Sequence, residues 1–318
     1  MLSKIEIGDL KWIDLESPSQ EELRDVMHEF DIDPMTMKEL LEPSLKPRTE
    51  DFKDYLYLVL HFPSIRDGRM LSEQEIDFIL GVDFLITTRY QAIPAFEELK
   101  MQLETGVTLN ENADLQSDEG GYKYAADLFL QLVEKMYHIV NMQIEDVQDD
   151  LEDIEEDIFN EKEKEMVFAL SYAGRDILNL KQALDPHQET LKSLESLIAN
   201  YSSSEHKRKL KVLESYYYKL RKNTSQLWHS LTELRETNNS LLTTKQNEVM
   251  KIFTILAFVT FPLSLVSSIF GMNTEYIPVT GMHIDLGFIV IKDFWVVIAL
   301  MLFATMLMFA YFKHKKWI

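Results

Sequence analysis

Residues 252–270 read IFTILAFVTFPLSLVSSIF, and Gly-Met-Asn follows this stretch at residues 271–273. The 19 positions of the stretch carry no charged side chain, and that length is enough to cross the hydrocarbon core of a bilayer. A second uncharged run of 19 residues, FWVVIALMLFATMLMFAYF, occupies residues 294–312. Two such runs are not typical of a soluble core, so the sequence predicts two transmembrane helices.

The charges around these two runs predict their orientation. The segment between them, residues 274–293, contains three acidic residues and one Lys. Four Lys residues flank the runs on the other side: Lys251, Lys313, Lys315 and Lys316. Because basic residues stay on the cytosolic side, we expect both termini in the cytosol and a multi-pass protein of the inner cell membrane.

One face of the first run is small or polar. Steps of three and four residues along a helix give the positions of this face: Asn247, Met250, Thr254, Ala257, Phe261, Ser264, Ser268 and Gly271. Two explanations are open at this point. Small side chains allow two helices to pack closely, and a repeat of about 3.5 residues also suits several copies of one helix around an axis. Pro262 interrupts the run and leaves the carbonyl of Phe258 without its helical donor.

The chain before the first run divides into two parts. Residues 1–121 mix short β-rich segments with helices, which predicts a cytosolic α/β/α domain. We expect strands at 10–15, 55–62, 75–80 and 83–88, and helices at 34–41 and 95–103. Another helix is predicted to begin at Ser17, as its N-cap, with Pro18 in the first turn.

Residues 122–204 lack strand patterns and predict acidic cytosolic helices. We expect three of them, at 122–160, at 163–184 and from Pro186 to about Ser203. From Glu205 the chain has neither Pro nor Gly until Pro262. A single helix from Glu205 to Phe270 would be about 100 Å long at about 1.5 Å per residue. The C-terminal part therefore divides into a stalk helix (205–251), a first span (252–273), an outer loop (274–293), and a second span with a basic tail (294–318).

Composition excludes several classes of function. The formal net charge is −21, from 53 acidic and 32 basic residues, and so acidic a chain has no basic face for nucleic acid. The chain has no Cys, which rules out disulfides and thiolate metal sites. It also lacks the phosphate-binding and catalytic motifs of the common enzyme classes. We therefore expect no enzyme activity, no catalytic cofactor and no nucleic-acid partner.

The densest acidic run lies at residues 145–157. Like charges three or four residues apart repel one another on a helix, and bound divalent cations would offset that repulsion. Asp149, Asp150 and Asp153 are our candidate ligands for a regulatory Mg²⁺ ion. The alternative is a solvated helix face whose apolar residues, such as Leu151, pack on a partner.

The Gly271-Met272-Asn273 motif, at the end of the first of two C-terminal spans, resembles the signature of the CorA family of magnesium and cobalt transporters. Residues 247–251, Asn-Glu-Val-Met-Lys, open the span, and a basic tail ends the chain, as in that family. The resemblance implies an α+β membrane protein assembled as a homopentameric funnel. Its stalk helix would continue into a first transmembrane helix that lines a central pore.

The resemblance also implies roles for individual residues. A ring of Asn273, next to Gly271 and Met272, would receive the hydrated ion at the outer mouth. Asn247 and Ser264 would form deeper polar rings. The remaining implied roles are a hydrophobic gate (Met250, Phe253 and Phe261), cation attraction in the outer loop (Glu275) and a basic cytosolic tail (Lys313, Lys315 and Lys316).

Four positions depart from the family pattern. Phe261 and Ser264 stand where the family commonly has Met and Thr. Phe270 stands where the family usually has Tyr, and Val212 stands where it has an Asp of the inhibitory metal site on the stalk. The resemblance still implies channel-like transport of Mg²⁺, with Co²⁺ and Ni²⁺ as further ions. Transport would be driven by the membrane potential and gated by intracellular divalent cations. The alternatives are a zinc transporter of the same superfamily and a non-conducting, membrane-anchored scaffold or sensor.

Overall fold

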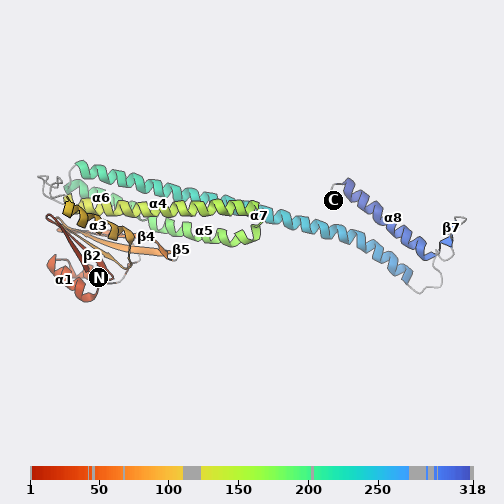
Figure 1. The fold of residues 1–318 in the computed structure, drawn as a ribbon, viewed down its shortest axis with the longest axis horizontal. Coiled ribbons are helices and arrows are strands. Elements are labelled where there is room, and N and C mark those ends of the chain that lie inside the picture. The colour runs from red at the N-terminus through yellow and green to blue at the C-terminus, as the bar shows by residue number, and fades with distance from the viewer. Residues whose placement is uncertain are drawn as a thin grey trace. The chain divides into compact units, whose positions relative to one another are not determined.

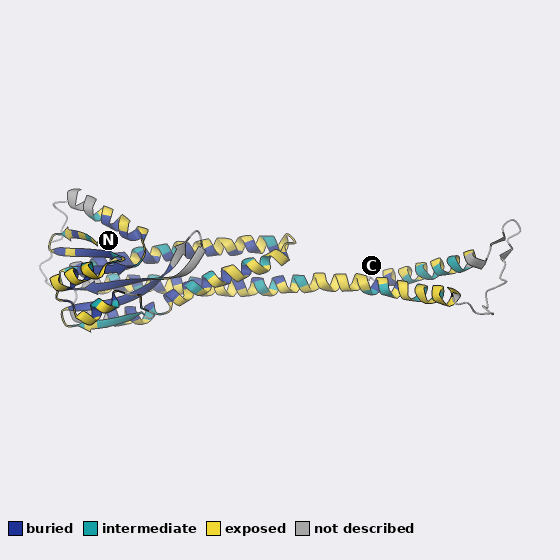
Figure 2. Cartoon of the chain, turned by 90° about the horizontal axis from the view of Figure 1, so that it is seen from below, coloured by how far each residue is buried: buried dark blue, intermediate teal, exposed yellow. Residues whose placement is uncertain are grey.

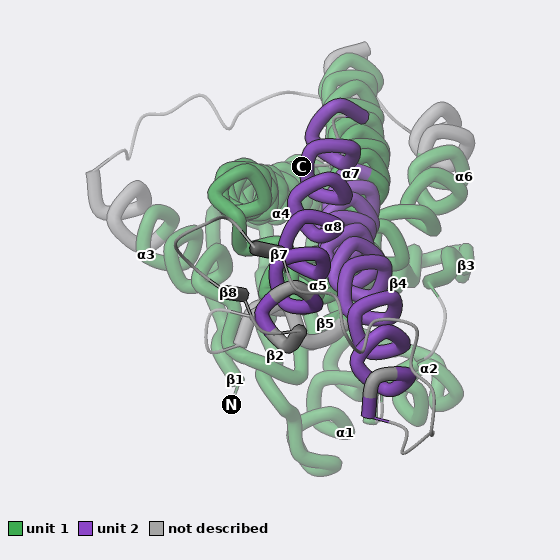
Figure 3. Tube along the Cα trace, turned by 90° about the vertical axis from the view of Figure 1, so that its right-hand side faces the viewer, with its two compact units in different colours: residues 1–236 green, residues 237–318 purple. Residues whose placement is uncertain are grey.

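The computed structural model describes residues 2–41, 43–44, 47–66, 69–109, 123–201, 204–271, 284–285, 290–291 and 293–315 (Figure 1). These residues form two compact units, Met1–Glu236 and Thr237–Ile318 (Figure 3). Each unit is described by itself below.

The first unit is built on a six-stranded sheet with the strand order β1-β2-β6-β5-β4-β3. Only the β2–β6 pair is parallel, and the other neighbours are antiparallel. The strands are β1 (Leu2–Ile7), β2 (Leu10–Glu16), β3 (Arg48–Phe52), β4 (Tyr55–Arg66), β5 (Arg69–Leu80) and β6 (Phe84–Arg89). The strands at 10–15, 55–62, 75–80 and 83–88 are thereby confirmed, whereas β1 and β3 had not been predicted.

Helices cover both faces of this sheet, because each strand alternates its side chains between two hydrophobic layers. On one face, α1 (Gln20–Glu29) packs through Leu23 onto Ile13, close to α2 (Pro34–Glu39). On the other face, α3 (Pro94–Leu109) contributes Phe96 against Trp12, and Phe129 of α4 meets Phe78 of β5. Figure 2 shows the strands as mostly buried between these layers.

The predicted N-cap of α1 is wrong. Ser17 has a positive φ of 45°, and its hydroxyl donates to the carbonyl of Tyr90 over 3.0 Å. Ser19 caps the helix instead: its hydroxyl accepts from the amide of Glu22, whose carboxylate accepts from the amide of Ser19. This reciprocal pair satisfies two free amides at the helix start, which the single contact of Ser17 could not do.

Four long helices make up most of the remaining chain. They are α4 (Lys123–Phe159), α5 (Glu163–Leu184), α6 (His187–Tyr201) and α7 (Ser204–Gly271). Their bounds confirm the helices predicted between residues 122 and 270, including the single helix from Glu205 to Phe270. Pro262 lies inside α7 without ending it.

The second unit contains the C-terminal part of α7 and α8 (Asp293–His314), with the short strands β7 (Ile284–Asp285) and β8 (Val290–Ile291). Both helices are long and apolar enough to cross a membrane. They contact each other through a small cluster of buried and half-buried side chains: Ile255, Val259 and Leu263 of α7 with Met308 and Phe312 of α8. Most other side chains of this pair are exposed, as Figure 2 shows.

Candidate ion pathway on helix α7

The small or polar face predicted at Asn247, Met250, Thr254, Ala257, Phe261, Ser264, Ser268 and Gly271, which we call the α7 stripe, forms one continuous helical face. All of its positions lie within the unbroken helix Ser204–Gly271, and 3.6 residues per turn place them in a single row. Asn247, Ser264 and Ser268 are exposed, and so are Met250 (58 %) and Phe261 (73 %). Large apolar side chains that expose more than half of their surface indicate a face that this chain does not cover by itself.

Helix α8 covers the opposite face of α7. Its contacts are made at Ile255, Val259 and Leu263, about half a turn from Ala257, Phe261 and Ser264 by helical geometry. Within the second unit, the α7 stripe therefore faces away from α8.

Phe253 lies at the edge of the α7 stripe, three residues after Met250 and four before Ala257. Its side chain is 63 % exposed. Gly271 ends the helix, and a β-carbon built there would meet no heavy atom within 4 Å. Nothing in the described part of this chain therefore requires a glycine at position 271.

The hydroxyl of Thr254 on the α7 stripe donates to the carbonyl of Met250 over 2.8 Å. Thr260, off the stripe, makes the same kind of bond to Leu256 over 2.9 Å. A hydroxyl has only one proton to donate. Toward its surroundings Thr254 therefore presents oxygen lone pairs, which accept hydrogen bonds from water.

Several predicted site residues lie outside the described residues: Met272, Asn273, Glu275 and Lys316. The other two residues of the predicted basic tail, Lys313 and Lys315, are exposed at the C-terminal end of α8.

The candidate regulatory acids Asp149, Asp150 and Asp153 are exposed on α4. Partial burial and the charges of Asp153, Asp146 and Asp149 raise the pKa of Asp150. In the described part of this single chain, no group of three or more His, Asp or Glu side chains is close enough to hold a metal ion. Val212, where the family has its stalk Asp, is 60 % exposed on α7.

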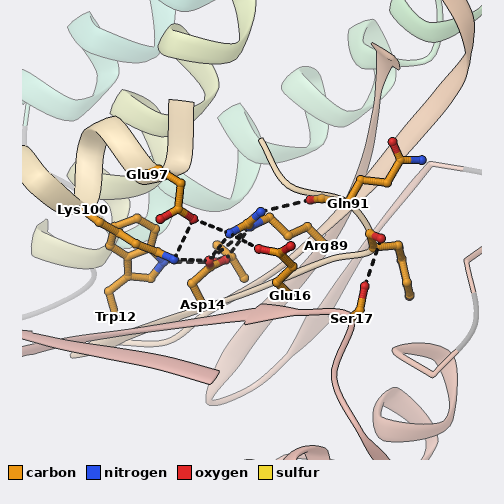
Figure 4. Close-up of polar contacts among 10 residues, drawn as sticks. Trp12, Asp14, Glu16, Ser17, Arg89, Gln91, Glu97 and Lys100 are labelled. Carbon is orange, nitrogen blue, oxygen red and sulfur yellow. Dashed lines mark hydrogen bonds and ion pairs between the residues drawn. The ribbon is translucent and has the colours of Figure 1, made fainter. Parts of the chain in front are cut away.

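A buried charge network in the first unit was missed by sequence reasoning (Figure 4). Arg89 of β6 is only 1 % exposed; it donates to Asp14 of β2 over 3.0 Å and to Glu97 of α3 over 2.7 Å. Lys100 of α3 lies 2.8 Å from Asp14. Removing one partner of such a network would leave a buried charge without compensation, so the network holds α3 on the sheet. The only sequence signal for it is a charged residue at each of two strand positions that face the core.

Known proteins resemble this chain in both sequence and fold. The cobalt/magnesium transport protein CorA of Thermotoga maritima is 24 % identical over 299 residues, covering 91 % of this chain and 78 % of that protein. The complete structure of the CorA magnesium transporter from Methanocaldococcus jannaschii has a TM-score of 0.81 at 19 % identity, covering 100 % of this chain and 95 % of that one. The cytoplasmic domain of ZntB from Vibrio parahaemolyticus has a TM-score of 0.59 at 14 % identity, covering 75 % of this chain and 90 % of that one.

The family described as CorA-like Mg²⁺ transporter protein matches residues 8–314, which includes the α/β domain, the long helices and both candidate membrane spans. The similarity is therefore not confined to the Gly-Met-Asn motif or to one unit. This chain belongs to the CorA-like Mg²⁺ transporter family.

Proposed function

We propose that five copies of this chain form a channel that conducts Mg²⁺ into the cell, with the α7 stripe lining the pore. Family membership makes the chain a divalent-metal transporter rather than an enzyme. The observation that carries the channel proposal is the position of α8, which covers the face of α7 opposite the stripe.

The polarity of the α7 stripe supports an assembly around an axis. In a bilayer, Ser264 and Ser268 would be costly against lipid, and polar side chains in spanning helices normally face protein or a water-filled cavity. Further copies of the same helix would cover this face and enclose a water-filled pore. The open space beside Gly271 fits such an arrangement, because a neighbouring copy can approach where this chain has no atoms.

The residue types of the proposed pore suit Mg²⁺. This ion dehydrates reluctantly and prefers oxygen ligands. We infer that a ring of Asn273 carboxamides holds the ion's hydration shell at the outer mouth and lets the ion leave. A ring of carboxylates would trap the ion. Ser264 and Asn247 form deeper polar rings. Met250, Phe253 and Phe261 form the apolar constrictions, which close by dewetting.

The membrane potential supplies the driving force. A divalent cation gains about 4.6 kcal/mol per 100 mV, twice the value for a single charge. We place the termini and the first unit in the cytosol and the loop 274–293 outside, with Glu275 attracting cations. The chain lies in the inner cell membrane, and Lys313, Lys315 and Lys316 face the cytosol.

We further propose that intracellular Mg²⁺ regulates the channel through the acidic face of α4. Asp149, Asp150 and Asp153 concentrate negative charge there, and partial burial together with this charge raises the pKa of Asp150. Because the described part of one chain has no three-ligand group, we infer that a regulatory ion is held between copies.

The deciding experiment is Mg²⁺ flux into liposomes under a negative-inside potential, with wild type and Asn273→Ala. Thr260→Val is the control, because it removes a hydroxyl from the same helix but off the α7 stripe. We expect flux in wild type and in the control, and its loss in Asn273→Ala.

Equal flux in Asn273→Ala and wild type would refute the pore assignment. Zn²⁺ uptake under a pH gradient without Mg²⁺ flux would favour a zinc transporter of the same superfamily. An assembly that moved none of these cations would be a scaffold or sensor.

A further inference from the structure

A buried cluster of ionisable side chains lies on the α1–α2 face of the sheet, far in sequence from the α7 stripe. His61 of β4 and Glu75 of β5 are cross-strand partners, and each is 5 % exposed. The Oε2 atom of Glu75 lies 3.2 Å from Nε2 of His61. That nitrogen points its proton toward the carbonyl of Ser44, 3.0 Å away. Among the described residues, neither oxygen of Glu75 therefore receives an aligned hydrogen bond.

A second buried carboxylate stands beside the first. Asp77 follows Glu75 by two positions in β5, so both side chains leave the same face of the sheet. Asp77 is 1 % exposed and accepts from the hydroxyl of Tyr57 over 2.9 Å and from that of Tyr90 over 3.4 Å. His61 Nδ1 likewise has no partner among the described residues.

Little positive charge faces these two acids. Arg48 of β3 stacks over the ring of Tyr57 at 5.4 Å, but it forms ion pairs with Glu39 and Glu50. Glu73 adds another negative charge near His61. Glu42 and Lys46, in the connection between α2 and β3, lie outside the described residues. The described cluster thus combines two buried acids with one histidine.

A buried carboxylate without hydrogen bonds requires a proton, a cation or water. A bound metal ion needs more ligands than the described residues supply, since no three-ligand group is found among them. One proton, in contrast, removes the repulsion between the two carboxylates at once. We propose that the His61–Glu75–Asp77 cluster is a proton-binding site, whose occupancy near neutral pH tightens the packing of α2 and α6 on β4.

The electrostatics of the cluster agree with this geometry. Burial and the charge of Glu75 raise the pKa of Asp77 to about 8, against hydrogen bonds from Tyr57 and Tyr90 that lower it. Burial alone would lower the pKa of His61, but the close contact with Glu75, the hydrogen bond to the Ser44 carbonyl and the charges of Glu75 and Glu73 raise it. Both groups bind protons more tightly in the folded state. Their stabilising effect is therefore present at low pH and is lost as pH rises through neutrality.

The cluster connects with three helices. The backbone carbonyl of His61 accepts from Nε2 of His187 in α6 over 2.7 Å, so His187 carries its proton on Nε2. Nδ1 of His187 then accepts from the hydroxyl of Tyr137 in α4 over 2.9 Å. Burial lowers the pKa of His187 to about 4, so it stays neutral while the cluster titrates. On the other side, the hydroxyl of Tyr90 lies 3.4 Å from Asp77 and 3.3 Å from the carbonyl of Leu40, just after α2, so its single proton is shared between these two acceptors.

The direct test is infrared difference spectroscopy of the full-length protein between about pH 6 and about pH 9, which detects the carbonyl stretch of a buried, protonated carboxylic acid. We expect wild type to lose one such band as pH rises. Asp77→Asn should abolish the change, because the amide mimics the neutral acid. Glu75→Gln should shift the band's titration to lower pH, because the like charge is gone. Asp54→Asn, an exposed acid in the turn before β4, is the matched control and should behave as wild type.

Hydrogen exchange of the same proteins tests the structural consequence. After correction for base catalysis, exchange in α2 and at the start of α6 should increase with pH in wild type and the control but not in Asp77→Asn. A band that persists in Asp77→Asn, or exchange in these helices that is independent of pH, would overturn the proposal. A band that responded to Mg²⁺ at fixed pH would assign the carboxylates to a metal ion and would also overturn it. None of these readouts depends on transport.

Discussion

At the residue scale, two threonines of α7 form a natural pair for testing the proposed pore. Thr254 and Thr260 both donate to the carbonyl four residues earlier, and both bonds are of nearly equal length. They differ in position, because only Thr254 lies on the α7 stripe. Any difference between their variants therefore reports on the direction that the side chain faces and not on the local helix.

We predict that Thr254→Val lowers Mg²⁺ flux severalfold, whereas Thr260→Val leaves it unchanged. Valine keeps the shape of threonine but removes the oxygen that accepts hydrogen bonds from the water around the ion. The measurement is initial flux in liposomes at equal protein content. Equal flux in the two variants would show that Thr254 does not face the ion path.

Gly271 gives a second prediction at this scale. Because a β-carbon at this position meets no heavy atom of the described residues within 4 Å, Gly271→Ala should leave the helix content and thermal stability of the subunit unchanged. We expect it to reduce Mg²⁺ flux, since in the proposed assembly the added methyl group points at neighbouring copies. Circular dichroism and flux measured on one preparation separate the two effects. Unchanged flux would mean that the position is open in the assembly as well.

At the element scale, the helices were predictable and the edges of the sheet were not. The bounds of α5 agree with the predicted 163–184, because long amphipathic periodicity and the Asp-Pro that follows both define the helix. The two strands of the six-stranded sheet that had not been predicted, β1 and β3, are its edge strands. β3 reads Arg-Thr-Glu-Asp-Phe and buries none of its residues fully, so it lacks the apolar alternation of an inner strand.

The candidate sites differ in the same way, because one could be predicted from the sequence and the two buried clusters could not. The α7 stripe lies within one helix, so its spacing could be read from the sequence. The pairing of His61 with Glu75 depends on the register of β4 against β5, and that of Asp14 with Arg89 on the register of β2 against β6. Register is set by tertiary packing, so no local pattern could have revealed either cluster.

The capping of α1 gives a prediction at the element scale. Ser19→Ala should destabilise the start of α1 by about 1 kcal/mol, because it removes one half of the capping box. Ser17→Gly should cost little, since glycine adopts the positive φ of that position readily. Hydrogen exchange of the amides of Glu22 and Leu23 is the measurement. Equal protection in the two variants would contradict the assignment of Ser19 as the cap.

At the scale of the whole molecule, the proposed function joins an acidic cytosolic part to a membrane pore. We predict that millimolar internal Mg²⁺ reduces flux in wild type. The triple variant Asp149→Asn, Asp150→Asn and Asp153→Asn should need more Mg²⁺ for the same reduction, because it removes the negative charge that attracts the ion.

The control for this prediction removes equal charge from exposed acids of the α/β domain: Glu6→Gln, Asp9→Asn and Asp54→Asn. If both triple variants shifted the Mg²⁺ response equally, the effect would be one of total charge rather than of a site on α4. A wild type insensitive to internal Mg²⁺ would remove regulation from the proposed function.

Pro262 makes the membrane part of α7 easier to bend at one turn. Its ring nitrogen cannot donate to the carbonyl of Phe258, so bending the helix there breaks no backbone hydrogen bond. The contacts with α8 at Val259 and Leu263 lie on either side of this point. Side-chain packing of α8 therefore resists bending at the turn of α7 that has one backbone hydrogen bond fewer, and the stiffness of the proposed pore wall depends on this packing as well as on the backbone.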